Sequence, residues 1–65
     1  MITVDDRRMK WSSGLTVAAL LDKVRPDFPF YVVKVNGKVV PRDEYGEHTI
    51  PDRADVRIVY MIAGG

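Results

Sequence analysis

The 65-residue chain contains no cysteine. A disulfide framework, a zinc–thiolate site and a thiol nucleophile of its own are therefore excluded. Because small secreted domains commonly depend on disulfides, we expect a cytoplasmic location. Long apolar runs are also absent: the longest, Ile58 to Ala63, is far shorter than the roughly 20 residues that a membrane-spanning helix requires. No basic segment followed by an apolar stretch opens the chain, so no signal peptide is expected.

The chain also has no large excess of positive or negative charge. Ten Lys and Arg residues against nine Asp and Glu residues leave a net charge of +1. Domains that bind nucleic acid through its phosphates usually carry a clear basic excess, so we expect neither nucleic acid nor a membrane as a partner. His48 is the single histidine, and no glycine-rich phosphate loop or serine-nucleophile motif is present. We therefore expect no catalytic residue, no metal site and no bound cofactor.

The first half of the chain predicts a hairpin and one helix. Residues 1–4 and 9–11 alternate between apolar and polar side chains around a polar turn at residues 5–8, which is typical of a β-hairpin. Thr16 is a suitable N-cap for a helix that runs to about Arg25, and Pro26 ends it. The apolar stripe of this helix has the spacing i, i+3, i+4, i+7 and consists of Val17, Leu20, Leu21 and Val24.

The second half predicts strands only, apart from a turn or short helical connection over residues 42–47. Asn36-Gly37 favours a tight turn that joins residues 31–35 to residues 38–40 in a second hairpin. A short strand is expected at residues 48–50, followed by a turn at residues 51–55. The last strand is expected over residues 56–62, with Val56, Ile58, Tyr60 and Ile62 on one face and Arg57, Val59 and Met61 on the other.

This order of elements predicts an α+β fold in which one helix covers one face of a mostly antiparallel sheet. If the last strand pairs with the first, the arrangement is a β-grasp (ubiquitin-like) fold, with a mixed four- to five-stranded sheet packed on one helix. A single domain over residues 1–65 is expected. The aromatic side chains of Trp11, Phe28, Phe30 and Tyr31 are expected in the core or at its rim.

The sequence ends in Gly64-Gly65, directly after Ala63 and the last predicted strand. Three extended residues span roughly 10 Å, which is enough to enter the active site of a partner while the folded body stays outside. Glycine has no Cβ, so a narrow channel can close around its backbone. We therefore expect a flexible C-terminal tail over residues 63–65 that delivers the Gly65 carboxylate to an ATP-dependent partner, because a carboxylate must be activated before acyl transfer.

Three segments carry a family resemblance across essentially the whole chain. They are Thr16-Val17 with Leu20-Leu21, the segment Val35 to Arg42 with its Asn-Gly and Val-Pro-Arg sequences, and Val56 to Gly65 with its Ile-Ala-Gly-Gly end. On these residues the sequence resembles the thiamine-biosynthesis sulfur carriers of the ThiS family, which are ubiquitin-like proteins. One departure is Asp52-Arg53-Ala54-Asp55, where the family commonly has a tighter Asp-Gly-Asp turn.

The resemblance implies a carrier and co-substrate, not an enzyme. A ThiF-like adenylating enzyme would use ATP to activate the Gly65 carboxylate. Sulfur that comes ultimately from a cysteine desulfurase persulfide would convert the adenylate to a thiocarboxylate, and thiazole synthase would then take the sulfur. Gly64 and Ala63 would be recognised as the tail, whereas Val59, Met61 and Ile62, on the strand that leads into it, are expected to help dock the partner.

Three other functions remain open from the sequence. The same chemistry could serve another recipient, as in the small subunit of molybdopterin synthase or in carriers for cysteine or homocysteine synthesis. A ubiquitin-like protein modifier that is attached to lysines through Gly65 is a second alternative. The third is a β-grasp interaction module in which the diglycine is only a flexible end.

Overall fold

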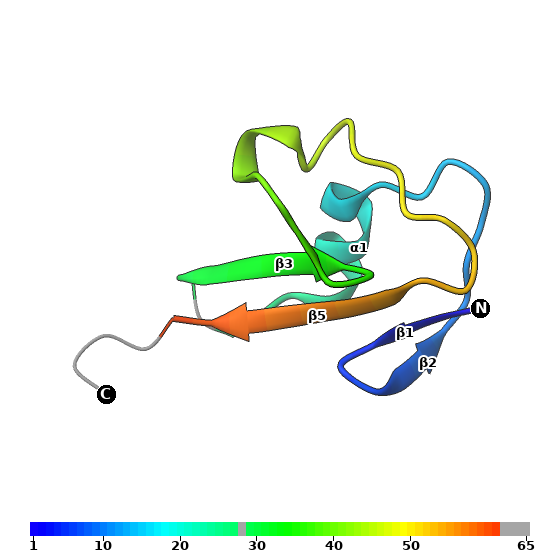
Figure 1. Cartoon of the computed structure of the whole chain (residues 1–65), viewed down its shortest axis with the longest axis horizontal. Coiled ribbons are helices and arrows are strands. Elements are labelled where there is room, and N and C mark those ends of the chain that lie inside the picture. Colours follow the sequence, from blue (N-terminus) through cyan, green and yellow to red (C-terminus); the bar gives the residue numbers. More distant parts are fainter. Residues whose placement is uncertain (28, 62–65) are drawn as a thin grey trace.

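The computed structural model describes residues 1–27 and 29–61. A single sheet has the strand order β2-β1-β5-β3-β4, in which β1 and β5 are parallel and the other neighbouring pairs are antiparallel. The elements are β1 (Ile2–Val4), β2 (Arg7–Met9), α1 (Val17–Val24), β3 (Tyr31–Val35), β4 (Lys38–Val40), the 3₁₀ helix η1 (Arg42–Glu44) and β5 (Asp55–Tyr60). Figure 1 shows α1 against one side of this sheet. The predicted β-grasp arrangement is therefore confirmed.

The core lies between α1 and one face of the sheet. On α1, Val17 and Leu20 are fully buried, whereas Leu21 and Val24 are half-buried and pack against the core. The sheet and the loops supply the remaining buried side chains: Ile2, Val4, Leu15, Val33, Val35, Val40, Ile50, Ala54, Val56 and Ile58. The apolar stripe that the helical spacing predicts is thus the stripe that faces the sheet.

Local signals set both ends of α1, as predicted. The side chain of Thr16 accepts a hydrogen bond from the Ala19 N–H at 3.2 Å, which is an N-cap. At the other end Arg25 adopts a left-handed backbone (φ 49°), and its N–H donates to the carbonyl of Leu21 at 2.8 Å. Pro26 follows and cannot continue the helix.

The two hairpins differ in how well the sequence predicts them. Asn36 and Gly37 have φ angles of 51° and 83°, so the second hairpin has the predicted turn. The predicted four-residue turn of the first hairpin is wrong, because only Asp5 and Asp6 form it and β2 begins at Arg7. Asp5 has a left-handed backbone although it is not a glycine. Its carboxylate accepts the Ile58 N–H at 3.0 Å, and this contact with β5 stabilises that conformation.

The predicted strand at residues 48–50 is also wrong, because this segment forms only an isolated bridge between Thr49 and Thr16. The last strand begins at Asp55, one residue earlier than predicted, because Asp55 pairs with Thr3 of the parallel neighbour β1. In the turn before it, Arg53 has a φ of 65°, so a residue other than glycine adopts a left-handed backbone where the family commonly has Asp-Gly-Asp.

The aromatic residues divide between the core rim and the surface. Trp11 is half-buried and donates its indole N–H to the Ile50 carbonyl at 2.6 Å, and Tyr31 packs partly buried against the core. The prediction for Phe30 is wrong: its side chain is 59% exposed. Strand alternation explains this, because Phe30 is two residues before Val32, which faces away from α1. Phe28 lies outside the described residues.

Candidate functional site

Strand β5 is the element that leads to the predicted site. It lies between β1 and β3 (Figure 1). Its last residue, Tyr60, is opposite Tyr31 in the pairing with β3. Beyond the strand, the N–H of Met61 donates to the carbonyl of Phe30 at 2.9 Å. The backbone is therefore held by hydrogen bonds as far as Met61. The predicted site residues Ile62, Ala63, Gly64 and Gly65 lie outside the described residues.

The face of the sheet that points away from α1, here called the outer face, carries the two predicted docking residues that the structure describes. Val59 is 42% exposed and Met61 is 54% exposed. Their neighbours Ile58 and Val56 on β5 are buried against the core. The predicted exposure of Val59 and Met61 is thus confirmed, since the helix covers only one face of the sheet.

The two residues belong to a larger apolar surface, the outer-face patch, which consists of Phe30, Val32, Val39, Val59 and Met61. Val59 is directly opposite Val32, and Met61 is hydrogen-bonded to the backbone of Phe30. On β4, Val39 is 56% exposed and is opposite Lys34, which places it diagonally beside Val32. Apolar side chains therefore lie beside the end of β5 on β3 and on the residue before it, and Val39 extends the patch across β3 to β4, level with Lys34 and Arg57.

The sequence reasoning missed three residues of this patch: Phe30, Val32 and Val39. The sequence nevertheless contains a pattern that places these three residues on the outer face. Alternation from the buried residues Val33 and Val35 places Val32 and Phe30 on the opposite face, and the Asn-Gly turn sets the register that places Val39 there.

The charged part of the outer face lies toward the beginning of β5. Arg57 forms ion pairs with Asp6 at 2.8 Å and Asp55 at 3.3 Å, and Asp55 also accepts the Thr3 hydroxyl at 3.0 Å. The hydrogen bond that the Arg57 guanidinium donates to Asp6, together with the charge of Asp55, raises the pKa of Arg57 above its ordinary value. This network compensates the arginine charge and leaves the end of β5 with a mainly apolar surface.

A cluster of aromatic and basic side chains covers the other side of the sheet at the same end. The rings of Tyr31 and Tyr60 make an edge-to-face contact with centroids 6.3 Å apart. The guanidinium of Arg42 lies 5.7 Å from the centre of the Tyr31 ring and donates to the Pro29 carbonyl at 3.0 Å. These contacts connect η1, β3 and β5, so the end of β5 is supported on both sides.

The described residues include His48 and acidic side chains, which are residue types that bind metal ions in proteins. Among them, no three His, Cys, Asp or Glu side chains are grouped so that they could hold a metal ion. His48 is half-buried, and its backbone N–H and carbonyl join Glu44 and Val17. In the part of the chain that the structure describes, no helix is long and apolar enough to cross a membrane.

A mixed five-stranded sheet packed on one helix defines this chain as a ubiquitin-like β-grasp protein, and its central strand leads into a sequence that ends in diglycine. The model of the ThiS family matches residues 2–65, so the chain belongs to the ThiS family of sulfur carriers.

Two relatives agree with this assignment over nearly the whole chain. The sulfur carrier protein ThiS of Escherichia coli (strain K12) is 28% identical over 64 residues, which cover 98% of this chain and 97% of the relative. The crystal structure of the thiamine biosynthesis protein ThiS from Geobacter metallireducens superposes with a TM-score of 0.81 at 25% identity and covers 98% of this chain and 97% of that chain.

Proposed function

We propose that this chain is the sulfur carrier for thiazole formation in thiamine biosynthesis and acts in the cytoplasm. A ThiF-like enzyme adenylates the Gly65 carboxylate, a persulfide from a cysteine desulfurase supplies the sulfur, and the resulting thiocarboxylate donates it to thiazole synthase. The carrier binds no cofactor, because ATP is used by the partner. Membership of the ThiS family supports this function, as do the names of the two relatives.

The observation that carries the proposal is the outer-face patch beside the end of β5. A partner that takes the last residues into its active site must also hold the folded body beside them, and the nearest apolar anchors are Val59 and Met61. Methionine adapts its shape to different surfaces, which suits a carrier that binds an activating enzyme and an acceptor in turn. Ala63 and Gly64 are the segment that the partner channels must accommodate.

The bond changes require little from the carrier itself. A Gly65 carboxylate oxygen attacks the α-phosphorus of ATP, and pyrophosphate leaves. The terminal sulfur of the persulfide then bonds to the acyl carbon while AMP departs with the oxygen. A thiol breaks the remaining S–S bond, which leaves the thiocarboxylate and a disulfide. Each catalytic group in this sequence belongs to a partner.

Intact-mass measurement tests the reaction at Gly65. Incubation with a ThiF-like enzyme, ATP and sulfide should increase the mass by the replacement of one oxygen with one sulfur. Deletion of Gly65, or one residue added after it, should abolish this change while the thermal transition stays nearly the same. Conversion of either variant would show that the Gly65 carboxylate is not the acceptor.

Substitution of the patch tests docking. We expect Met61→Asp to weaken binding to the ThiF-like enzyme at least tenfold, about 1.4 kcal/mol, because docking would bury an unpaired charge. Val59→Asp combined with Met61→Asp should fold but scarcely react. Ala19→Asp is the matched control, since it adds the same charge at an exposed position on α1. Wild-type affinity of a folded Met61→Asp variant in titration calorimetry would rule out docking through this patch.

A further inference from the structure

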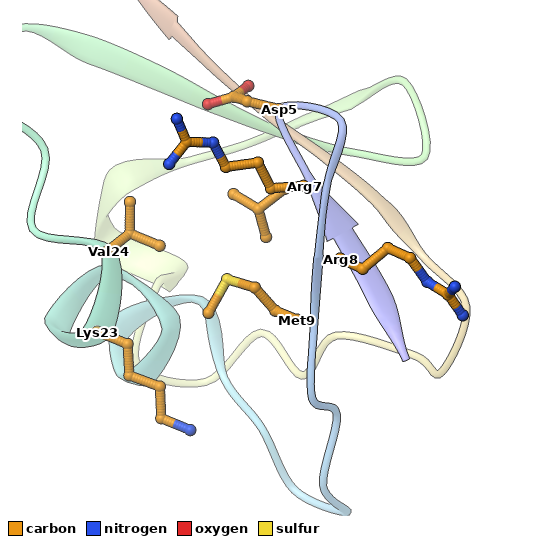
Figure 2. Close-up of a pocket in the computed structure, with 7 residues that line it drawn as sticks. Asp5, Arg7, Arg8, Met9, Lys23 and Val24 are labelled. Atoms are coloured by element: carbon orange, nitrogen blue, oxygen red, sulfur yellow. The ribbon is translucent and has the colours of Figure 1, made fainter.

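A groove lies at the opposite edge of the sheet, between β2 and the last turn of α1. Its volume is about 590 Å³, within the range of ligand sites. The residues that line it are Val4, Asp5, Arg7, Arg8, Met9, Lys23 and Val24 (Figure 2). None of them belongs to the outer-face patch, so this groove is separate from the docking surface described above.

The groove has an apolar floor and a basic rim. Arg7 and Met9 pair with Val4 and Ile2, so strand alternation directs both side chains toward α1 and directs Arg8 toward the outer face. Figure 2 shows the same arrangement: the side chains of Arg7 and Met9 lie on the side of α1, whereas Arg8 points away. Met9 and Val24 are only half-buried and therefore leave apolar surface open between the cations of Arg7 and Lys23.

The positive charge at the rim is not compensated by ion pairs within the described part of the chain. The ion pairs there join Arg57 to Asp6 and Asp55, and the N-terminal amine to Asp52. The Asp5 carboxylate at one end of the groove already accepts the Ile58 N–H. Asp5 keeps its negative charge there, but Arg7, Arg8 and Lys23 outnumber it among the lining residues, so the groove is basic on balance although the whole chain carries a net charge of only +1.

Strand β2 also offers backbone hydrogen bonds at this edge. In a hairpin with a two-residue turn, the residues that flank the turn, here Val4 and Arg7, exchange backbone hydrogen bonds. The alternation of an antiparallel pair then directs the N–H and the carbonyl of Arg8 away from β1. Because β2 is the edge strand, these groups are available to a further strand.

We propose that this groove binds an extended segment of a partner protein in which aliphatic side chains are flanked by Asp or Glu. The segment adds to β2 as a further strand, with an aliphatic side chain on Met9 and Val24 and its carboxylates beside Arg7 and Lys23. Nucleic acid fits less well, because the apolar floor of Met9 and Val24 offers phosphates neither a positive charge nor a hydrogen-bond donor. Since the outer-face patch is on other strands and on the other face, both surfaces can be occupied together.

An NMR titration of the whole chain tests this proposal with the peptide acetyl-Glu-Asp-Val-Ile-Val-Asp-Glu-amide. Amide shifts are expected at Arg8, Met9 and Val24 and not at Val59. Arg7→Glu combined with Lys23→Glu should weaken binding at least tenfold, whereas Lys38→Glu, which reverses one exposed charge at the far edge, should change it less than twofold. Arg8→Pro removes the outward N–H without affecting the β1 ladder and should also weaken binding at least tenfold.

Two variant peptides keep the test independent of the folding of any protein variant. Replacement of the aliphatic residues by serine, or of the acidic residues by lysine, should each abolish the shifts. Equal binding of the serine peptide, or stronger binding of a short oligonucleotide at the same amides, would show a general anion surface and overturn the proposal. Absence of shifts at about 1 mM of the original peptide would overturn it as well, and would leave the basic residues as a charged sheet edge.

Discussion

Leu20→Ala is the most direct test of how this small domain is held together. Leu20 is fully buried at the centre of the interface between α1 and the sheet, and no part of its side chain is exposed. Leu21, the next residue of the same helix, is only half-buried at the rim of the same core. The same substitution at these two positions changes helix propensity equally, so that the difference between them measures burial alone.

The expected cost at Leu20 is about 2–5 kcal/mol, which combines the lost transfer free energy with the cavity that remains. A domain of 65 residues has a total stability of only about 3–10 kcal/mol at typical values per residue. Leu20→Ala should therefore remove a large part of it and lower the melting temperature by at least about 10 °C. Leu21→Ala should cost less than about half as much, because part of its side chain already contacts solvent.

Urea unfolding followed by the fluorescence of Trp11, the single tryptophan, gives both free energies in one assay. Equal m-values would show that the substitutions change stability rather than the unfolded state. Equal losses at the two positions, or a loss below about 0.5 kcal/mol at Leu20, would refute the assignment of the buried face.

Two further predictions concern a turn and a terminus. Gly37→Ala should destabilise the protein by about 1–2 kcal/mol in the same assay, because the φ of +83° at Gly37 disfavours a Cβ. Gly46→Ala is the control and should cost nothing, since Gly46 has no positive φ and has open space around it. The hydrogen bond from the N-terminal amine lowers the pKa of Asp52 below its ordinary value of 3.8. The stability that this contact contributes is therefore present above pH 3.8 and is lost as the pH falls through the pKa of Asp52 in the folded protein. Urea unfolding of wild type and Asp52→Asn should differ at pH 6 and converge in acid; an identical difference at both pH values would contradict this.

Much of the fold can be predicted because its signals are local. Thr16 caps the helix, Pro26 prevents its continuation, and the backbone preference of Asn36-Gly37 favours the second turn, which hydrogen bonds between Asn36 and Asp55 then support. Errors occur where a distant segment decides the conformation. The first turn is set by the contact of Asp5 with Ile58 on β5, which no nearby pattern indicates.

The candidate site also has a part that the sequence predicts and a part that depends on distant contacts. The sequence alone predicts Gly64 and Gly65 as site residues from their type and position, and strand alternation predicts the exposure of Val59 and Met61. Which further side chains join them depends on the register between β3 and β5, which brings Val32 opposite Val59 and Phe30 beside Met61.

Local residue chemistry and hydrophobic periodicity in the sequence therefore determine where the second hairpin turns, where the helix begins and ends, and which residues alternate along each strand. Only the tertiary structure decides which alternating faces share one surface. The parallel pairing of β1 with β5 joins Thr3 to Asp55 across nearly the whole chain, and it places β2 at the edge where the groove beside α1 forms. The physical reason is that a change of strand register by one residue turns every side chain to the other face, and contacts distant in sequence select the register.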